Sequence, residues 1–307
     1  MHTRAKGYLL GALAAATYGL NPLFALPLYR AGMGPDSVLF FRYLFALPML
    51  FVLLRVRGGR LTVTRDEVGP LVLMGLLMGA SSLTLFESYR HMQAGIASTL
   101  LFIYPVIVSG LMCLLYGELF SWLMACCMLL TLSGIGMLYK ATDGATLSLD
   151  GTLLVITSAA SYALYIVAIN RGPLQRLPTL TTTFYVLLFG LSLFLFRVVR
   201  SGEVLLPDRW YLWGNLIALA LFPTTISLVA TTAAIQRIGS TPTALLGALE
   251  PVTAIVIGVV GFGERLSIRD IAGIGLILVA VTLIVSEGSA GRWVLRLRKL
   301  FPRPPKG

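Results

Sequence analysis

Long apolar runs, one after another along most of the chain, constrain this fold more than any other feature of the sequence. Of the 307 residues, 57% are apolar and only 12% are charged, whereas soluble domains carry about 25% charged residues. So little charge cannot cover a water-facing surface, which excludes a soluble enzyme, a disordered chain and a nucleic-acid-binding domain. The sequence therefore predicts an all-α integral membrane protein.

The apolar runs have the length of membrane spans. A helix needs about 20 apolar residues to cross the bilayer core, and the chain contains ten such runs. They cover roughly residues 7–29, 36–54, 68–88, 95–116, 120–139, 151–170, 179–199, 211–235, 241–262 and 267–286. Most connections are short and rich in glycine and proline, so we expect ten transmembrane helices and no domain outside the bilayer. A signal peptide remains an alternative for the first run, which follows two basic residues.

Basic residues flank the apolar runs instead of forming one patch. The net charge of +11 therefore indicates topology and no nucleic-acid partner. With the N-terminus inside, fifteen Lys and Arg residues fall on the inside and eight on the outside. The positive-inside rule then predicts a multi-pass protein of the inner (plasma) membrane with both termini cytoplasmic. We expect the basic tail, residues 289–307, to lie near anionic membrane lipid.

The two halves of the chain resemble each other. Ala15-Ala16-Thr17-Tyr18 matches Ala159-Ala160-Ser161-Tyr162 at an offset of 144 residues. Pro105-Val106 matches Pro251-Val252 at an offset of 146, and at the same offset Gly117-Glu118 matches Gly263-Glu264. We therefore divide the chain into a first repeat, residues 1–146, a second repeat, residues 147–288, and the tail. The repeat also argues against a signal peptide, because the counterpart of the first run is an internal helix.

Each repeat contains five spans, which is an odd number. Two tandem copies must therefore enter the membrane from opposite sides, giving the inverted 5+5 repeat that is typical of secondary transporters. Two bundles related in this way can exchange conformations and so alternate access to a site between them. We expect a substrate cavity near the middle of the membrane, where the halves meet.

Several motifs carry a resemblance to a known family. They are Tyr18-Gly19-Leu20-Asn21, Arg42 in the second span, Pro105 with Gly117-Glu118, and Leu249-Glu250-Pro251 with Gly263-Glu264. With this layout, the chain resembles the drug/metabolite transporter superfamily and, within it, the ten-span EamA type. The resemblance implies export of small metabolites, with neutral or aromatic amino acids as the best guess. One departure is clear: the four-span multidrug relatives carry a coupling glutamate in the first helix, and this chain has no acidic residue in span one or span six.

Enzyme and metal motifs are absent from the sequence. There is no G-x-x-x-x-G-K-[ST], no GxSxG, no HExxH and no CxxC. We therefore expect no catalytic residue, no metal and no cofactor, and a transporter rather than an enzyme. Two alternatives stay open: an intramembrane enzyme acting on a lipid or lipid-linked substrate, and a facilitative multidrug or metabolite channel.

Glu250 is the strongest single candidate for a functional residue. It lies near the middle of the ninth span and precedes Pro251, which frees a backbone carbonyl about one turn earlier. Ionisable groups at membrane depth are costly and mark functional sites. Glu250 is expected either to bind a cation, an ammonium group or a proton, or to hold the broken helix by a structural hydrogen bond. Its repeat partner is Tyr104, before Pro105, so both prolines are expected to kink their helices.

Two further ionisable residues are expected toward the outer face. Arg42 lies in the second span and Glu87 at the end of the third. Because an unpaired guanidinium in the membrane is expensive, a buried Arg42–Glu87 ion pair is favoured, and the two residues are expected to form this pair or to act in gating. The alternative is that Arg42 holds a substrate carboxylate.

Aromatic and polar side chains complete the predicted site. The substrate-binding set joins Glu250 with Tyr18, Asn21, Phe24, Tyr104, Tyr162 and Tyr165. For each aromatic residue, ordinary helix packing is the competing interpretation. Glu118 and Glu264 follow glycines at span ends and are predicted to fix hairpins. The GxxxG spacings Gly7/Gly11 and Gly75/Gly79 are predicted to pack helices of the same chain.

Overall fold

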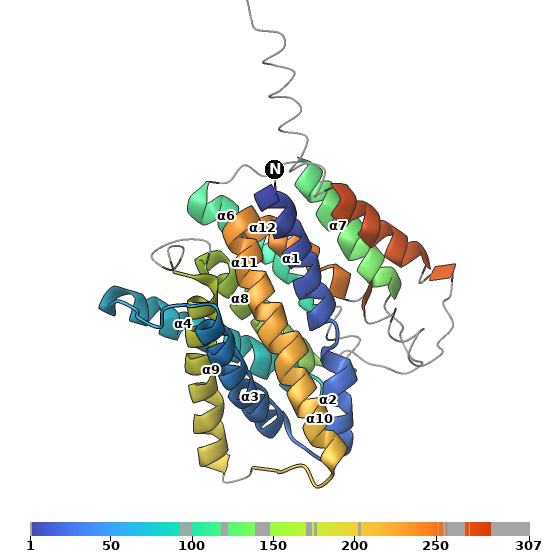
Figure 1. The fold of residues 1–307 in the computed structure, drawn as a ribbon. Helices are drawn as coiled ribbons and strands as arrows, with labels where there is room; N and C mark the ends of the chain where they lie inside the picture. Colours follow the sequence, from blue (N-terminus) through green and yellow to red (C-terminus); the bar gives the residue numbers. More distant parts are fainter. Residues whose placement is uncertain are drawn as a thin grey trace, which may run out of the picture.

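The protein is a bundle of helices (Figure 1). The computed structural model describes residues 2–92, 97, 100–117, 122–138, 148–169, 174, 177–201, 204–250, 252–253, 256, 268–269 and 271–283. These residues are helical or lie in turns and loops, and no strand occurs among them. The predicted all-α class is thus confirmed for the described part of the chain.

The helices follow the predicted apolar runs. They are α1 (His2–Tyr18), α2 (Asn21–Arg30), α3 (Pro35–Val56), α4 (Arg65–Ser88), α6 (Tyr104–Tyr116), α7 (Trp122–Leu138), α8 (Leu149–Ile169), α9 (Thr179–Ser201), α10 (Trp210–Leu219), the π-helix η2 (Ala220–Ile226), α11 (Ser227–Ile238) and α12 (Ser240–Leu246). A further apolar helix runs from Ile271 to Leu283.

Six helical segments of the described chain are long and apolar enough to cross a membrane. They are Thr3–Arg30, Pro35–Val56, Arg65–Ser88, Leu149–Ile169, Thr179–Arg200 and Trp210–Ile238. Shorter apolar helices occupy the predicted spans four, five and ten. Large apolar side chains such as Leu114 (84% exposed) and Trp210 (86%) face outward, which suits a lipid environment. The predicted count of ten spans goes beyond these residues and stays a prediction.

Local sequence explains where several helices begin and end. Thr64 and Glu67 form a capping box at the start of α4, in which the Thr64 amide donates to the Glu67 carboxylate at 2.7 Å. Pro35 occupies the first turn of α3, where its missing amide hydrogen costs nothing. Gly117 ends α6 with a φ of 62°, a left-handed conformation that suits glycine.

Helices of the first half pack mainly on helices of the second half. α1 runs along α11, α4 packs on α8 and α9, and α3 packs on α9 (Figure 1). Small residues permit the close approach: a Cβ at Gly7 would collide with Ile238, and one at Gly75 with Phe189. The prediction that the GxxxG pairs pack helices of the same chain is therefore confirmed for these contacts.

The first and the eighth predicted spans are not regular helices. The first span breaks at Gly19–Leu20, so α1 and α2 are separate helices. The eighth span contains the seven-residue π-helix around Pro223, because proline removes a backbone donor and clashes with the preceding turn. Each run still forms one segment long enough to cross the membrane, Thr3–Arg30 and Trp210–Ile238, with an interruption inside it. Interrupted backbone at membrane depth is tolerated where it is buried in protein or lines a cavity.

Candidate functional site

A narrow cavity lies where the two halves meet. Both predicted repeats contribute to its lining: Gly11, Ala14 and Ala15 of α1 and Tyr104 of α6, with Tyr162 and Ile166 of α8, Ser227 and Thr231 of α11, Thr243 of α12, Gly247 and Glu250. Its free volume is about 10 Å³, room for about one water molecule. The cavity is therefore nearly closed in this structure, and its polar groups come from helices that would have to part to admit a solute.

Two helix interruptions at equivalent repeat positions flank this cavity. Residues 102–103 form a turn before Tyr104, and residues 247–248 form a turn before Glu250. Both turns are tightened by i to i+3 bonds: the Ile103 amide donates to Leu100 at 3.1 Å, and the Ala248 amide to Leu245 at 3.2 Å. Each interruption lies ahead of its proline. Pro105 consequently sits in the first turn of α6 and does not kink it, which corrects the prediction.

Tyr104 bridges from one interruption to the other. Its hydroxyl donates to the Ala244 carbonyl at 2.9 Å, near the end of α12. A Cβ at Gly247 would collide with the same hydroxyl. The glycine therefore makes room for a phenol from the opposite half, directly beside the segment that carries Glu250.

Three of the predicted tyrosines form one aromatic group. The rings of Tyr104 and Tyr162 meet edge to face with centroids 5.0 Å apart, and Tyr162 stacks on Tyr165 at 6.0 Å. Tyr104 and Tyr162 share the cavity with Glu250. The structure thus brings together four residues of the predicted set, and the internal sequence repeat was the signal that pointed to Tyr104, Tyr162 and Glu250.

The remaining predicted residues of this set lie on α1 and α2. Tyr18 ends α1, and the adjacent Gly19 packs so closely on the Glu250 carbonyl that a Cβ would approach it to 2.5 Å. Asn21 is 4% exposed, and neither atom of its amide has a hydrogen-bond partner among the described residues. Phe24 lies apart from the cavity lining and stacks on Phe222 of η2 at 6.1 Å, which is a packing contact.

Arg42 is buried, but its partners differ from the predicted one. The side chain is 1% exposed. Its Nε donates to the Thr224 hydroxyl at 2.5 Å, and its Nη2 donates to the Pro223 carbonyl at 3.2 Å. Glu87 instead pairs with Arg90 at 2.9 Å. The predicted Arg42–Glu87 ion pair is therefore wrong in this structure, because neighbouring residues supply each group with a nearer partner.

The π-helix explains why acceptors face Arg42. The Thr224 hydroxyl donates to the Leu219 carbonyl and the Thr225 hydroxyl to the Ala220 carbonyl, each at 2.8 Å and five residues back. The carbonyl of Pro223, in the same π-helix, accepts from Nη2 of Arg42. Pro223 and Thr224 were not among the residues predicted from the sequence. A proline followed by two threonines in the middle of an apolar run is the signal that could have found them.

A family model confirms the repeat pattern that the sequence suggested. The model described as EamA-like transporter family matches this chain twice, over residues 5–140 and 149–286. The chain belongs to the EamA-like transporter family. Membership makes it a membrane-spanning transporter of the drug/metabolite type, whose two matched stretches correspond to the two halves that enclose the cavity.

Curated relatives of this EamA-like transporter are bacterial. The uncharacterized transporter YcbK of Bacillus subtilis is 23% identical over 266 residues, covering 83% of this chain and 84% of the relative. The threonine/homoserine exporter RhtA of Escherichia coli K12 is 24% identical over 243 residues, covering 76% and 77%. YyaM, also an uncharacterized transporter of Bacillus subtilis, is 28% identical, but the match spans only about half of either chain (50% and 52%).

A solved structure has the same fold as this EamA-like transporter. It superposes with a TM-score of 0.76 at 18% identity, covering 91% of this chain and 96% of the other. At this identity the likeness concerns the fold alone. It extends over almost the whole length of both chains, so the helices around the cavity belong to a shared architecture.

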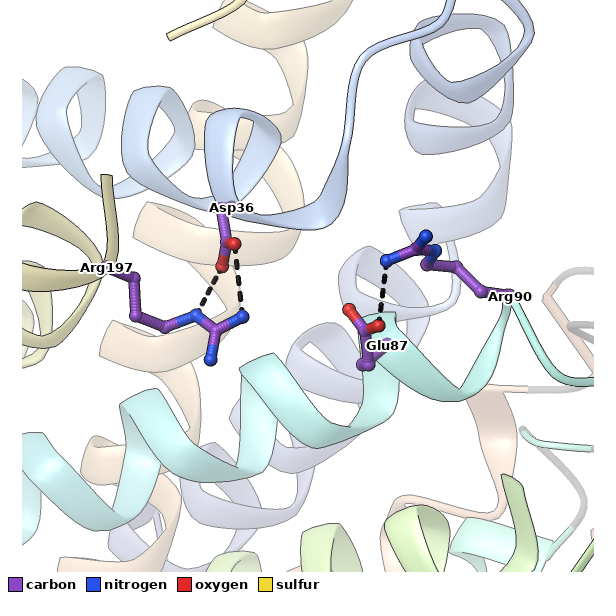
Figure 2. Close-up of polar contacts among 4 residues, drawn as sticks. All are labelled: Asp36, Glu87, Arg90 and Arg197. Carbon is purple, nitrogen blue, oxygen red and sulfur yellow. Dashed lines mark hydrogen bonds and ion pairs between the residues drawn. The ribbon is translucent and has the colours of Figure 1, made fainter. Parts of the chain in front are cut away.

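A second, wider recess lies at one end of the transporter, where α2 and α4 end and α3 begins. Its volume is about 500 Å³, and its lining includes Tyr29, Asp36, Glu87 and Arg90. Two ion pairs lie at this end: Arg197 donates to both carboxylate oxygens of Asp36, at 2.6 and 3.1 Å, and Glu87 pairs with Arg90 (Figure 2). The first pair ties α3 to α9, helices from opposite halves.

Three predicted residues lie outside the described part of the chain. They are Pro251, the expected kink of the ninth span, and Glu118 and Glu264, the expected hairpin residues. Their predicted roles remain predictions.

Proposed function

We propose that this transporter exports small metabolites from the cytoplasm, with neutral or aromatic amino acids as the favoured substrates. The observation that carries the proposal is the cavity between the halves, which joins Tyr104, Tyr162 and Glu250 at two interrupted helices. The family supports transport, and the relative RhtA, whose name states threonine and homoserine export, supports amino acids as substrates.

The proposed mechanism is alternating access by rocking of residues 1–146 against residues 147–288. The interruptions at residues 19–20, 102–103 and 247–248 occur where helices from both halves meet. Such points can absorb backbone rotation while the packed helices on either side move as rigid bodies. The nearly closed cavity then corresponds to an intermediate with the substrate path shut on both sides.

Glu250 is the proposed coupling group. It lines the cavity together with hydroxyl groups, among them Ser227, Thr231 and Thr243. A carboxylate in this position can hold a proton or a substrate ammonium group, and the two would compete for it. Protons are thus the proposed coupling ion, and the substrate gradient alone is the alternative driving force.

The proposed orientation places both termini in the cytoplasm of a bacterial inner membrane. Single cysteines at Gly117 and Gly263, in a background lacking the three native cysteines, test the inverted repeat on which it depends. We expect a membrane-impermeant thiol reagent to label one position from each side. Labelling of both from the same side would refute the inversion, and with it the cavity between inverted halves.

Transport is tested with the pure protein in proteoliposomes. Counterflow of labelled L-threonine, L-homoserine, L-phenylalanine and L-tryptophan measures substrate exchange without a proton gradient. Efflux under an imposed pH gradient measures coupling to protons. Glu250→Gln keeps the size of the side chain but cannot release a proton. The matched control is Glu67→Gln, since glutamine also completes a capping box at that position.

The outcomes separate the proposed roles. If Glu250 carries only the proton, Glu250→Gln keeps counterflow and loses the response to the pH gradient, while Glu67→Gln behaves as wild type. If Glu250 binds the ammonium group, counterflow falls as well. An unchanged rate and pH response in Glu250→Gln would remove Glu250 from the mechanism. Wild-type protein that moves none of these amino acids faster than empty liposomes would refute the proposed function.

A further inference from the structure

Arg42 is a buried cation with unused hydrogen-bonding capacity. A guanidinium carries five N–H donors, and two contacts engage it here: Nε with Thr224 and Nη2 with Pro223. Its Nη1 has no hydrogen-bond partner among the described residues. The contacts occupy the side formed by Nε and Nη2, so the edge formed by Nη1 and the second N–H of Nη2 is left to bind something else.

No carboxylate neutralises this guanidinium in the part of the chain that the structure describes. The ion pairs found there join Arg90 to Glu87 and Arg197 to Asp36. Arg42 instead lies over two aromatic rings, with its Cζ 6.0 Å from the Tyr18 centroid and 5.5 Å from that of Phe86. Aromatic faces and neutral oxygens compensate a buried charge only in part, so an anionic ligand would find a strong partner here.

Other buried polar groups near this guanidinium also lack partners. The Tyr29 hydroxyl is unpaired among the described residues, and its ring meets Phe86 edge to face at 6.1 Å, on the same ring that Arg42 covers. Asn21, whose amide is equally unpaired, lies three residues after Tyr18. Buried polar groups in folded proteins are almost always paired. Several unpaired groups around Phe86 and Tyr18 therefore point to a ligand that supplies the missing acceptors and donors.

The same place is adjacent to Glu250. Tyr18 has Arg42 over its ring, and its neighbour Gly19 packs on the backbone of Glu250. Arg42 and the backbone of Glu250 thus both lie against the segment Tyr18–Gly19, where α1 ends.

We propose that Arg42 binds the carboxylate of an α-amino acid through its free Nη1 edge, while Glu250 receives the ammonium group of the same molecule. This inference rests on the proposed function and names the chemical class of its substrate: a zwitterion with a free carboxylate. A planar guanidinium matches a carboxylate with two parallel hydrogen bonds, which an ammonium group on lysine cannot reproduce. Tyr18 then belongs to the same site, because its ring lies under Arg42 and its neighbour Gly19 packs on the Glu250 backbone.

The test compares substrates that differ only at the carboxylate. Counterflow in proteoliposomes is measured with L-threonine, L-threoninamide and 1-amino-2-propanol, and in an aromatic series with L-phenylalanine, L-phenylalaninamide and phenethylamine. In the better-transported series, the amino acid is expected to exchange at least about tenfold faster than its amide or its amine, because a charged hydrogen-bonding group would be left unpaired. Equal rates for the acid and the amide in wild-type protein would overturn the inference and leave the proposed function standing.

Variants assign the discrimination to Arg42. Arg42→Gln is expected to lower amino-acid counterflow. It should also bring the rate for the amino acid, divided by the rate for its amide, close to one. Arg42→Lys should keep this rate ratio between the values of wild type and Arg42→Gln. The control is Arg55→Gln: Arg55 lies on the same helix, over the ring of Phe51 at 5.1 Å, and is exposed. If Arg42 had only a structural role, Arg42→Gln would lower the rates for the acid and the amide together and leave their ratio unchanged. That result would overturn the inference.

The remaining outcomes are also decisive. If Arg42→Gln does not yield a monodisperse protein, the wild-type comparison of acid and amide decides alone. If wild-type protein transports none of the amino acids, the proposed function fails and this inference falls with it. If the inference alone fails, the protein transports amino acids but exchanges the acid and its amide at equal rates.

Discussion

The contact between Tyr104 and Gly247 gives the sharpest test of how the two halves meet. Gly247 has φ −53° and ψ −23°, which any residue can adopt, so Gly247→Ala introduces no backbone strain. Its effect is steric, because the new methyl group would collide with the Tyr104 hydroxyl. Tyr104 would have to move and give up its 2.9 Å bond to the Ala244 carbonyl.

The size of the effect follows from two terms. Loss of the hydrogen bond costs about 1 kcal/mol, and overpacking of a buried contact costs about 1–3 kcal/mol. We therefore expect Gly247→Ala to lower the free energy of unfolding by about 2–4 kcal/mol. Tyr104→Phe alone should cost about 1 kcal/mol. The double variant should be more stable than Gly247→Ala, since removal of the hydroxyl relieves the closest contact of the new methyl group.

The assay is reversible unfolding in mixed detergent micelles, followed by far-ultraviolet circular dichroism. Gly110→Ala is the control, because a Cβ there meets no atom within 4 Å; it should change stability by less than about 1 kcal/mol. Two results would contradict the reasoning: Gly247→Ala as stable as the control, or a double variant that shows the sum of the single losses.

Further predictions concern the helix contacts and the setting of Arg42. Gly75→Ala should destabilise the α4–α9 contact by about 1–3 kcal/mol in the same assay, since its Cβ would meet α9 backbone at 2.9 Å, whereas Gly69→Ala on the same helix has free space and should not. Thr224→Val should cost about 1.5–3 kcal/mol because it strands the guanidinium Nε, while Thr225→Val removes a hydroxyl that does not contact Arg42 and should cost less; equal losses would contradict this assignment. Asp36→Asn should cost less than about 1 kcal/mol, because the side chains of this ion pair are 27% and 41% exposed, and high salt should reduce the difference from wild type.

Composition and repetition carried most of the fold prediction. Spans and their order follow from apolar length, which is a local property that needs no knowledge of contacts. The two matches of the family model coincide with halves that were recognised from short motifs around Tyr18, Tyr162, Pro105 and Pro251. The same periodicity placed Tyr104 and Glu250 at equivalent positions, and both line the cavity.

The partners of Arg42 could not be predicted in the same way. The predicted topology placed Arg42 and Glu87 toward the same outer face, yet Arg90 lies three residues from Glu87 and pairs with it locally. The acceptors of Arg42 lie 182 and 181 residues away along the chain. Both acceptors belong to the π-helix around Pro223, which the apolar pattern of the eighth span did not predict.

The order of the residues determined that this chain spans a membrane, repeats itself and carries an acid and an arginine at membrane depth. These features depend only on the length of the apolar segments and on where the charged residues occur along the chain. The folded structure decided which polar groups share a space and which are left without a partner. Hydrogen bonds depend on distances and angles between helices that are remote in sequence, so the free edge of Arg42 and the closed cavity beside Glu250 emerge only when the two halves pack together.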